Sequence, residues 1–191
     1  FRSANPNVTQ VPHNSSPYGK ECRSLFGVPD GWYQAGIDAC GLELRCLAHF
    51  LYPFDNGHYA DVVVNGDIHT LNQKAAGLPT RDKAKTFIYA FLYGAGDNKM
   101  GKIIGGTDAE GKAVKRRFLK KVPAITGLRN AVKGVLVEEY HGQIVKWKRH
   151  WLKGLDGRHL HVRSIHSALN LLLQSAGALV CKYRSEERRV G

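Results

Sequence analysis

The sequence predicts an α+β fold, in which helices fill the middle of the chain and short strands lie on either side of them. Three observations support this fold class. Hydrophobic residues make up 43% of the 191 residues, which is enough for a buried core. Apolar residues recur at helical spacing in several segments, and runs of aromatic and apolar residues typical of strands flank those segments. The length allows one large domain or two small ones.

The expected elements begin after residues 1–31, an extended and turn-rich segment that is rich in Pro, Asn, Ser and Gly. In order, they are a strand at 32–37, helices at 42–51, 68–76, 81–93, 112–121 and 125–137, strands at 144–151 and 159–163, and a helix at 167–182. The last eight residues, 184–191, carry five charges and no periodic apolar face, so we expect a frayed or foreign end there.

Local signals justify the first helices. The helix at 42–51 presents one apolar face, formed by Leu44, Leu47, Ala48 and Leu51. Pro53 is expected to end this helix, because proline lacks the N–H that a helix needs. The helix at 68–76 follows Gly66 and Asp67.

The long helix at 81–93 has signals at both ends. Thr80 is a plausible N-cap, and Asp82 is favourably placed near the positive helix end. Gly94 and Gly96 are expected to end the helix. The next stretch, for which we expect no regular element, is punctuated by Gly101, Gly105, Gly106 and Gly111.

The last third of the chain reads as two helices, a hairpin and a helix. Pro123 separates the helices at 112–121 and 125–137. The turn sequence Gly-Leu-Asp-Gly at 154–157 predicts a hairpin between the two strands around it. Three polar residues interrupt the apolar run of the final helix: Asn170, Gln174 and Ser175.

The charge of the chain predicts a polyanionic partner. Lys and Arg number 28 against 16 Asp and Glu, so the net charge is +12 and the isoelectric point is about 9.7. Nucleic acid is the first candidate, although charge alone does not distinguish DNA, RNA and an acidic membrane surface. No apolar run approaches the roughly 20 residues that cross a bilayer, and no signal peptide is visible. Because the chain starts at Phe1, we expect a piece of a longer protein.

The cysteines and histidines do not predict a zinc site. The four cysteines are scattered without a Cys-x-x-Cys pair, so reduced thiols are the default. His159 and His161 share one face of an expected strand but lack a third ligand at suitable spacing. A surface or phosphate-contacting role suits them better.

One helical face is the most informative feature of the chain. Arg81, Lys85, Tyr89 and Tyr93 lie four residues apart and therefore share a face of the helix at 81–93. Two fixed cations can hold a triphosphate, and an aromatic ring one turn on can stack on a sugar or base. The alternative is an ordinary solvated face with basic and aromatic side chains.

A second segment, Asp-Ala-Cys-Gly-Leu-Glu-Leu-Arg at 38–45, places acidic residues between a strand and a helix. Asp38 ends the expected strand, where a carboxylate can hold a divalent cation through hard oxygen ligands. Glu43 lies in the first turns of the following helix. Taken alone, an Asp at the end of a strand is more often a helix cap.

Together these two segments resemble motifs A and B of family A DNA polymerases, and in particular the T7-like bacteriophage replicative polymerases. The resemblance runs from about Asn5 to about Lys182. Its further matches are Asn-Pro-Asn at 5–7, Gln-Val-Pro at 10–12, Ser-Pro-Tyr-Gly at 16–19, Gly-Asp-Ile-His at 66–69, Pro-Thr-Arg at 79–81, Val-Lys-Trp-Lys at 145–148, Gly-Leu-Asp-Gly at 154–157 and Ala-Leu-Asn-Leu-Leu-Leu-Gln-Ser-Ala-Gly at 168–177.

The resemblance implies a partial polymerase palm, with an antiparallel sheet that carries Asp38, and a helical fingers subdomain. The implied parts are an N-terminal part of the palm at 1–55, fingers at 56–140, a hairpin and helix returning to the palm at 141–183, and a tail outside the family at 184–191. The implied activity is DNA-directed DNA synthesis, in which a dNMP is added to a primer 3′-hydroxyl by two-metal phosphoryl transfer.

The resemblance also implies site residues. Asp38 and the backbone carbonyl of Ala39 would bind the two Mg²⁺ ions, and Lys85 would be the catalytic proton donor to the leaving group. The residues expected to bind the dNTP are Glu43, as the gate against a ribose 2′-hydroxyl, with His69, Arg81, Lys85 and Tyr89. Those expected to bind template and primer are Tyr93, Asn170, Gln174, Asn7 and Gln10, of which Asn170 and Gln174 contact the minor groove.

Simpler roles remain open for some of these residues. His69 could satisfy its own helical turn, and Asn170 could bridge within the core. Tyr93 and Gly94 could be simple packing and a helix stop.

The chain departs from the family pattern in three ways. The third motif, a His-Asp pair on a hairpin, is absent, and with it the second metal-binding aspartate. The thumb and proofreading regions would precede Phe1. Ala90 stands where the T7-like pattern has Gly, a mild change in a helix. We therefore expect the isolated chain to be inactive, which Mg²⁺-dependent primer extension would contradict.

Two other functions compete with the polymerase. One is a non-catalytic nucleic-acid or nucleotide-binding module derived from a polymerase. The other is a single-subunit RNA polymerase, which Glu43 argues against because such an enzyme must admit the 2′-hydroxyl. For the polymerase, the expected partners are primer–template DNA and dNTPs, with no membrane, and a processivity factor is left open for the full-length protein. The expected location is the cytoplasm of an infected bacterium.

Overall fold

The computed structural model describes residues 11–33 and 38–187, and of 184–187 the backbone alone. The chain divides into two compact units, residues 1–38 and 39–191. The first unit contains a short helix, α1 (Gly19–Ser24), within the segment that we expected to be extended. Trp32 and Tyr33 have no regular secondary structure, and the rest of the expected strand at 32–37 lies outside the described residues.

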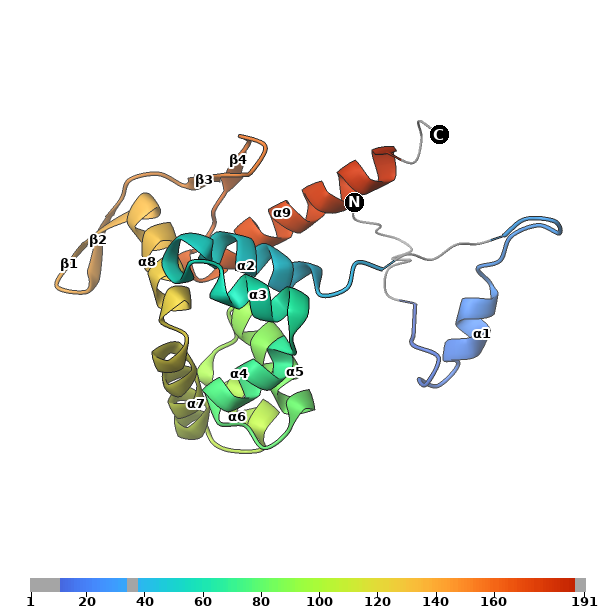
Figure 1. Cartoon of the computed structure of the whole chain (residues 1–191), viewed down its shortest axis with the longest axis horizontal. Coiled ribbons are helices and arrows are strands. Elements are labelled where there is room, and N and C mark those ends of the chain that lie inside the picture. The colour runs from blue at the N-terminus through green and yellow to red at the C-terminus, as the bar shows by residue number, and fades with distance from the viewer. Residues whose placement is uncertain (1–10, 34–37, 188–191) are drawn as a thin grey trace. The chain divides into compact units, whose positions relative to one another are not determined.

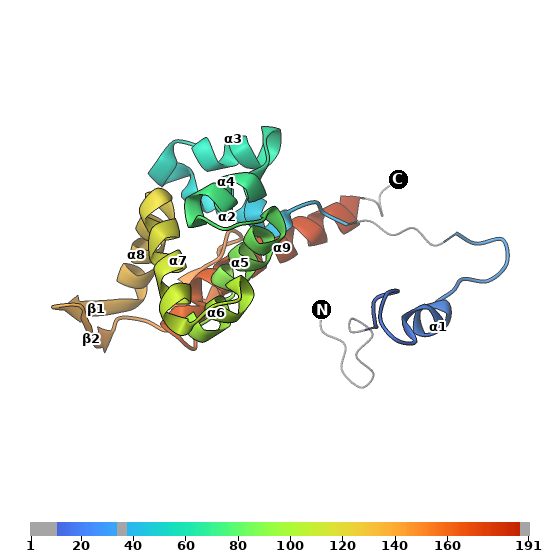
Figure 2. The ribbon, with the colours of Figure 1, turned by 90° about the horizontal axis from the view of Figure 1, so that it is seen from below.

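The second unit is mainly helical (Figures 1 and 2). Its elements are α2 (Leu42–Asp55), α3 (His58–Asn65), α4 (Ile68–Ala76), α5 (Arg81–Leu92), α6 (Asp97–Ile104), α7 (Asp108–Lys121), α8 (Pro123–Leu136), β1 (Val137–Tyr140), β2 (Gln143–Trp147), β3 (Trp151–Lys153), β4 (His159–His161) and α9 (Ile165–Glu187). The combination of helices with small antiparallel sheets confirms the α+β fold class.

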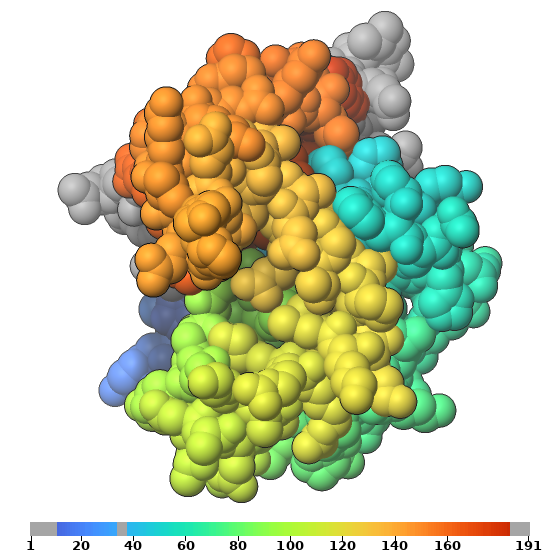
Figure 3. Space-filling view, turned by 90° about the vertical axis from the view of Figure 1, so that its left-hand side faces the viewer, coloured from blue at the N-terminus to red at the C-terminus, as the bar shows by residue number. Residues whose placement is uncertain are grey.

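A continuous hydrophobic core joins the helices of the second unit. Helix α2 packs against α3, α8 and α9, and α4 packs against α5 and α7. Figure 3 shows α8, in yellow, running between the strands, in orange, and helices α2 and α3, in cyan. The largest side chains that are fully buried include Tyr59, Phe87 and Phe118. The ring of Phe118 on α7 meets those of Phe87 and Phe91 edge-on, with centroids 5.3 Å apart in both pairs.

The strands form two separate hairpins. β1 pairs with β2 in antiparallel register with an irregularity after Glu138, and β3 pairs with β4 so that Leu152 faces Leu160. The expected turn at 154–157 therefore joins two paired strands. The expected strand at 144–151 is wrong as one element, because its residues are divided between β2 and β3. Neither described sheet carries Asp38, which lies in an irregular segment.

Two helix predictions were wrong. Helix α2 continues through Pro53 to Asp55, and Asn56 then ends it with φ 52°. The proline removes one intrahelical hydrogen bond, to the carbonyl of His49, and burial of Leu47 and Leu51 in the core offsets that loss. Helix α3 was not expected, yet its Tyr59 is buried and its Val62 and Val63 pack on the core. The carboxylate of Asp55 accepts hydrogen bonds from the N–H groups of Gly57 and Tyr59 at the start of α3, both at 2.9 Å.

Two of the glycines after α5, Gly101 and Gly111, allow close helix packing. Helix α6 occupies the stretch that we expected to be irregular, and it packs closely on α7. A Cβ on Gly101 would lie 2.4 Å from the carbonyl oxygen of Thr107, and a Cβ on Gly111 would lie 2.3 Å from that of Asp97. Only glycine allows two backbones to approach so closely. Helix α7 starts earlier than expected because Thr107 and Glu110 form a capping box.

The final helix is longer than expected at both ends. Helix α9 spans Ile165–Glu187, so its backbone includes the first residues of the expected tail at 184–191. Its last turns project from the other helices of the unit in Figures 1 and 2. Among the described helices, none is both long and apolar enough to cross a membrane.

Candidate functional site

Helix α5 carries the predicted face of basic and aromatic residues. Its N-cap is Thr80, whose hydroxyl accepts a hydrogen bond from the N–H of Lys83 at 3.2 Å. Arg81, Lys85 and Tyr93 are exposed, and Tyr89 is half-buried. The opposite face, with Ala84, Phe87, Ile88 and Phe91, is buried in the core. The helix is thus fixed by its apolar face, and the other face is open to a ligand.

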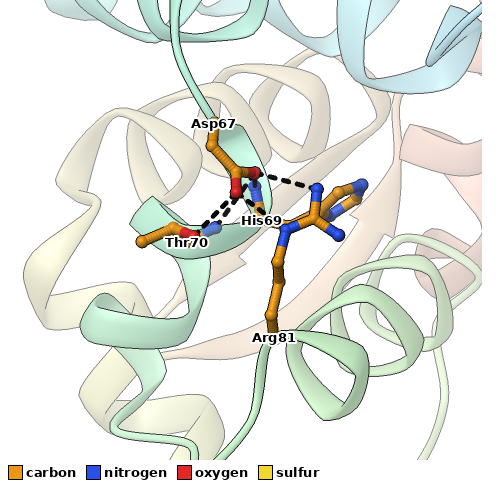
Figure 4. Close-up of polar contacts among 4 residues, drawn as sticks. All are labelled: Asp67, His69, Thr70 and Arg81. Carbon is orange, nitrogen blue, oxygen red and sulfur yellow. Dashed lines mark hydrogen bonds and ion pairs between the residues drawn. The ribbon is translucent and has the colours of Figure 1, made fainter.

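Arg81 meets the start of α4 through Asp67 (Figure 4). Its Nε and Nη2 donate to the two oxygens of the Asp67 carboxylate at 2.7 and 3.1 Å. The same carboxylate caps α4: it accepts from the backbone N–H of His69 at 3.0 Å and of Thr70 at 3.4 Å, and from the Thr70 hydroxyl at 2.8 Å. The cap therefore links the first turn of α4 to the first turn of α5.

Charge and burial shift the pKa values of this cluster. The hydrogen bonds from Arg81 and Thr70 hold the pKa of Asp67 well below its usual range, and the carboxylate raises the pKa of Arg81 in turn. Burial lowers the pKa of His69, and the positive charges of Arg81 and Lys85 lower it further against the opposing effect of Asp67. A neutral His69 beside two cations is arranged to gain a proton when an anion arrives.

His69 lies between this cluster and the aromatic part of α5. Its ring centroid is 6.2 Å from that of Tyr89. Its Nδ1 is buried and has no hydrogen-bond partner among the described residues. A buried polar atom without a partner is costly, which makes this ring a candidate for contact with a ligand or a bound water.

Glu43, Tyr93 and Gln174 meet although they come from three different helices. The hydroxyl of Tyr93, at the end of α5, donates a hydrogen bond to Oε1 of Glu43 in the first turn of α2. That bond and burial raise the pKa of Tyr93, while a hydrogen bond with Gln174 on α9 acts in the opposite direction. The contact joins Glu43, the expected sugar gate, to Tyr93 and Gln174, which are both expected to bind template and primer.

A buried polar pair that was not predicted from the sequence joins α3 to α4, the helix that carries His69. Asn72 on α4 is fully buried and donates through Nδ2 to the hydroxyl of Tyr59 on α3 at 3.2 Å. Burial raises the pKa of Tyr59, to which Tyr89 also contributes. Asp67 was likewise not identified as a site residue. Its place directly before the helix at 68–76 was the signal that could have identified it as a cap.

The other predicted site residues differ in their exposure. Asp38 is exposed at the end of the first unit, and Ala39 is exposed at the start of the second. Asn170, on the same face of α9 as Gln174, is half-buried. Asn7 and Gln10 lie outside the described residues. Across the described ranges, no group of three or more His, Cys, Asp or Glu side chains could hold a metal ion.

A cavity of about 310 Å³ lies near the C-terminal end of α5, away from the predicted nucleotide-binding residues. Its polar lining includes Lys115, Arg129 and His166. Lys115 already pairs with Asp97 at 2.8 Å, and Arg129 lies over the ring of Phe91. Its cations thus have partners of their own, and the exposed face of α5 remains the better candidate site.

Comparison with known proteins relates the chain to polymerases. The family described as DNA polymerase family A matches residues 1–185. The DNA-directed DNA polymerases of Enterobacteria phage T3 and Escherichia phage T7 are each 60% identical to it over 189 residues, which cover 93% of this chain and 27% of theirs. The mitochondrial DNA polymerase subunit gamma-1 of Drosophila melanogaster is 28% identical over 151 residues, which cover 69% of this chain and 12% of that protein. The chain thus spans about a quarter of the length of its phage relatives.

Proposed function

The chain belongs to DNA polymerase family A, and from this premise we propose that it forms the nucleotide-selecting part of a phage DNA-directed DNA polymerase. The proposed reaction is template-directed addition of a dNMP to a primer 3′-hydroxyl. The observation that carries the proposal is the exposed α5 face, whose Arg81 is fixed against α4 beside His69. Such an arrangement suits the binding of a triphosphate.

The triphosphate is assigned to Arg81, Lys85 and His69. Arg81 and Lys85 lie one helical turn apart on α5, and both influence the pKa of His69. Three groups that can be positive would offset the charge that develops on the leaving pyrophosphate. Lys85 would donate a proton to the pyrophosphate oxygen as the bond to the α-phosphorus breaks. Tyr89, one turn further along α5, would pack on the sugar and base.

Sugar selection is assigned to Glu43. Its carboxylate accepts the hydroxyl hydrogen of Tyr93, and this bond restricts the positions that the side chain can occupy. A carboxylate held beside the sugar leaves no room for a 2′-hydroxyl, so dNTPs would be preferred over rNTPs. Discrimination of this kind follows from steric exclusion and unpaired polar groups.

Contact with the primer–template duplex is assigned to Tyr93, Asn170 and Gln174, with Asn7 and Gln10 in the first unit. Asn170 and Gln174 are one turn apart on α9, and Gln174 is joined to Tyr93. Amide side chains suit the minor groove, whose acceptors are common to A·T and T·A pairs. They would therefore test the shape of a base pair without reading its sequence.

The metal ions of the reaction need ligands beyond those described. Asp38 and the carbonyl of Ala39 supply hard oxygens of the kind that Mg²⁺ prefers. They do not form a metal site by themselves, because the described residues lack a cluster of three suitable side chains. We propose Asp38 and the carbonyl of Ala39 as ligands of a two-Mg²⁺ site whose second carboxylate does not come from the described residues.

The partners and location follow from the same proposal. The partners would be primer–template DNA and dNTPs, with a processivity factor as a further candidate for the full-length protein. The phage relatives suggest a phage-encoded protein that acts in the cytoplasm of an infected bacterium.

Nucleotide binding tests the proposal directly. Replacing Arg81 with Ala should weaken dCTP binding by about tenfold or more, since a charge-assisted bidentate contact is worth roughly 1.5–3 kcal/mol. Arg116→Ala is the matched control, because Arg116 is an exposed arginine of α7, a helix that carries none of the residues assigned to the nucleotide, and it should change binding less than about twofold. Equal binding by both variants, measured by calorimetry, would contradict the site. Binding that depends on Arg81 without any nucleotide incorporation by the full-length protein would favour the non-catalytic module.

A further inference from the structure

The carboxylate of Asp67 lies among the cations assigned to the triphosphate, where a negative charge should oppose phosphate binding. We infer that Asp67 is a positioning residue for the incoming nucleotide: it holds the guanidinium of Arg81 in one orientation and the first turn of α4 in place, so that both present donors to the triphosphate. This inference rests on the proposed function and adds a residue that touches no substrate itself.

The geometry of the ion pair fixes the plane of the guanidinium. Arg81 donates through Nε and Nη2 to different oxygens of the carboxylate, at 2.7 and 3.1 Å. Two parallel hydrogen bonds hold both the direction and the rotation of a planar group, whereas one bond would leave it free to turn.

The carboxylate is itself held in place. It accepts three hydrogen bonds from the first turn of α4, from the backbone N–H groups of His69 and Thr70 and from the Thr70 hydroxyl. The other end of α4 is also fastened, because Arg117 of α7 donates to the carbonyl oxygens of Ala76 and Gly77. Arg81 is thus tied to a helix that cannot easily shift.

The ion pair leaves Arg81 able to bind a second anion. A guanidinium has five N–H donors, and Asp67 uses two of them. The other three form no hydrogen bond with any described residue, and the side chain is 50% exposed. Asp67 therefore occupies one edge of the guanidinium, and the opposite edge remains available for phosphate oxygens.

The same contact sets the position of His69, whose backbone N–H is bound to Asp67 and whose ring lies near Tyr89. One carboxylate thus orders two of the three residues assigned to the triphosphate. Its charge and its positioning effect have opposite consequences for binding. Loss of the charge alone should strengthen the binding of an anion, whereas loss of the positioning should weaken it, so the sign of the change decides between them.

Asp67→Asn removes the ion pair with Arg81 and keeps the cap of α4, so it tests the ion pair alone. Asparagine caps helices as well as aspartate does, so its Oδ1 can still accept from His69 and Thr70. Its amide nitrogen cannot accept from the Nε of Arg81. The matched control is Asp82→Asn, which removes a negative charge next to Arg81 on α5 where the carboxylate forms no hydrogen bond with any described residue.

We expect Asp67→Asn to weaken dCTP binding by about fivefold or more, the loss expected from a misplaced charge-assisted contact. Asp82→Asn should leave binding unchanged or slightly stronger. In a protein that already carries Arg81→Ala, Asp67→Asn should not weaken dCTP binding further, since its effect passes through Arg81.

In ¹⁵N-arginine NMR spectra, the Nε–H of Arg81 should lose its protection from exchange in Asp67→Asn but not in Asp82→Asn. Thr70→Val, which removes one bond to the carboxylate, should show the same effects more weakly if Asp67→Asn does not fold.

Unchanged or tighter dCTP binding by Asp67→Asn, together with a large loss in Arg81→Ala, would overturn the inference and leave the proposed function standing. Additive losses in the double variant would also overturn it. Equal binding by the native chain and Arg81→Ala would instead show that the proposed function fails, and the inference would fail with it.

Discussion

The hydroxyl of Tyr93 donates a hydrogen bond to the carboxylate of Glu43, fifty positions earlier in the chain. The bond joins the end of α5 to the first turn of α2. Gln174 on α9 also forms a hydrogen bond with Tyr93. The proposed sugar gate is therefore linked to two residues for which we propose contact with the duplex, and we predict that substitutions at Tyr93 alter sugar selection.

Removing the gate should relax sugar selection. Glu43→Ala is expected to reduce the preference for dCTP over CTP by about tenfold or more, because steric and polar rejection of one hydroxyl is lost. Tyr93→Phe should reduce it less, by a few-fold, since a single hydrogen bond contributes roughly 0.5–1.5 kcal/mol. The two nucleotides differ only at the 2′ position, so competitive binding to this chain, or incorporation by the full-length protein, measures the effect directly.

The controls for this prediction are Glu138→Ala and Tyr140→Phe, two exposed residues of β1. Neither substitution should change the preference for dCTP over CTP. If Glu43→Ala still rejects CTP as strongly as the native protein does, Glu43 is not the sugar gate.

His69 should take up a proton when the triphosphate binds. Its pKa lies below the ordinary 6.5 because of burial and the nearby Arg81 and Lys85. A bound polyanion adds negative charge beside the ring and should raise this pKa. The terminal phosphate of dCTP also titrates near this pH, so the test is a comparison. Calorimetry of dCTP binding near pH 6.5 in two buffers of different ionisation enthalpy should show more proton uptake by the native protein than by His69→Gln. Equal proton exchange by the two proteins would contradict the assignment of His69.

The free energy of unfolding should depend on pH in part through Asp67. Its folded-state pKa is lowered from 3.8, so the unfolded chain binds more protons, and the contribution to stability is present above 3.8 and lost as the pH falls toward the folded value. The difference in free energy of unfolding between the native protein and Asp67→Asn should therefore shrink between about pH 5 and pH 2. Urea unfolding of both proteins across this pH range measures the difference. A difference that does not change with pH would mean that the ion pair does not form in solution.

The close packing of α6 on α7 should make Gly111 intolerant of a side chain. Gly111→Ala places a Cβ 2.3 Å from the carbonyl oxygen of Asp97 and should destabilise the fold by about 1–3 kcal/mol through overpacking. Gly134→Ala on α8 meets nothing within 4 Å and should stabilise it by up to about 1 kcal/mol, because alanine favours a helix. Thermal or urea unfolding measures both. Equal effects would show that α6 and α7 are not in close contact.

The sequence predicted the parts of the fold that depend on neighbouring residues. The helix at 68–76 was predicted with its bounds, and Thr80 was predicted as the cap of α5. The same local reasoning failed at Pro53 and at Gly101, because a proline can be tolerated near a helix end and a glycine can serve packing as well as a turn. Those choices are made by the neighbouring helix and are not visible in a short window of sequence.

The sequence by itself determined the family, the amphipathic character of α5 and the residues on its polar face, since periodicity and motif spacing are properties of the chain. Only the tertiary structure decided that Asp67 holds Arg81 and that Tyr93 holds Glu43. Such pairs depend on how separate helices dock. Helix docking is driven by burial of apolar faces, which leaves the polar contacts at their edges to be set by the final crossing of the helices.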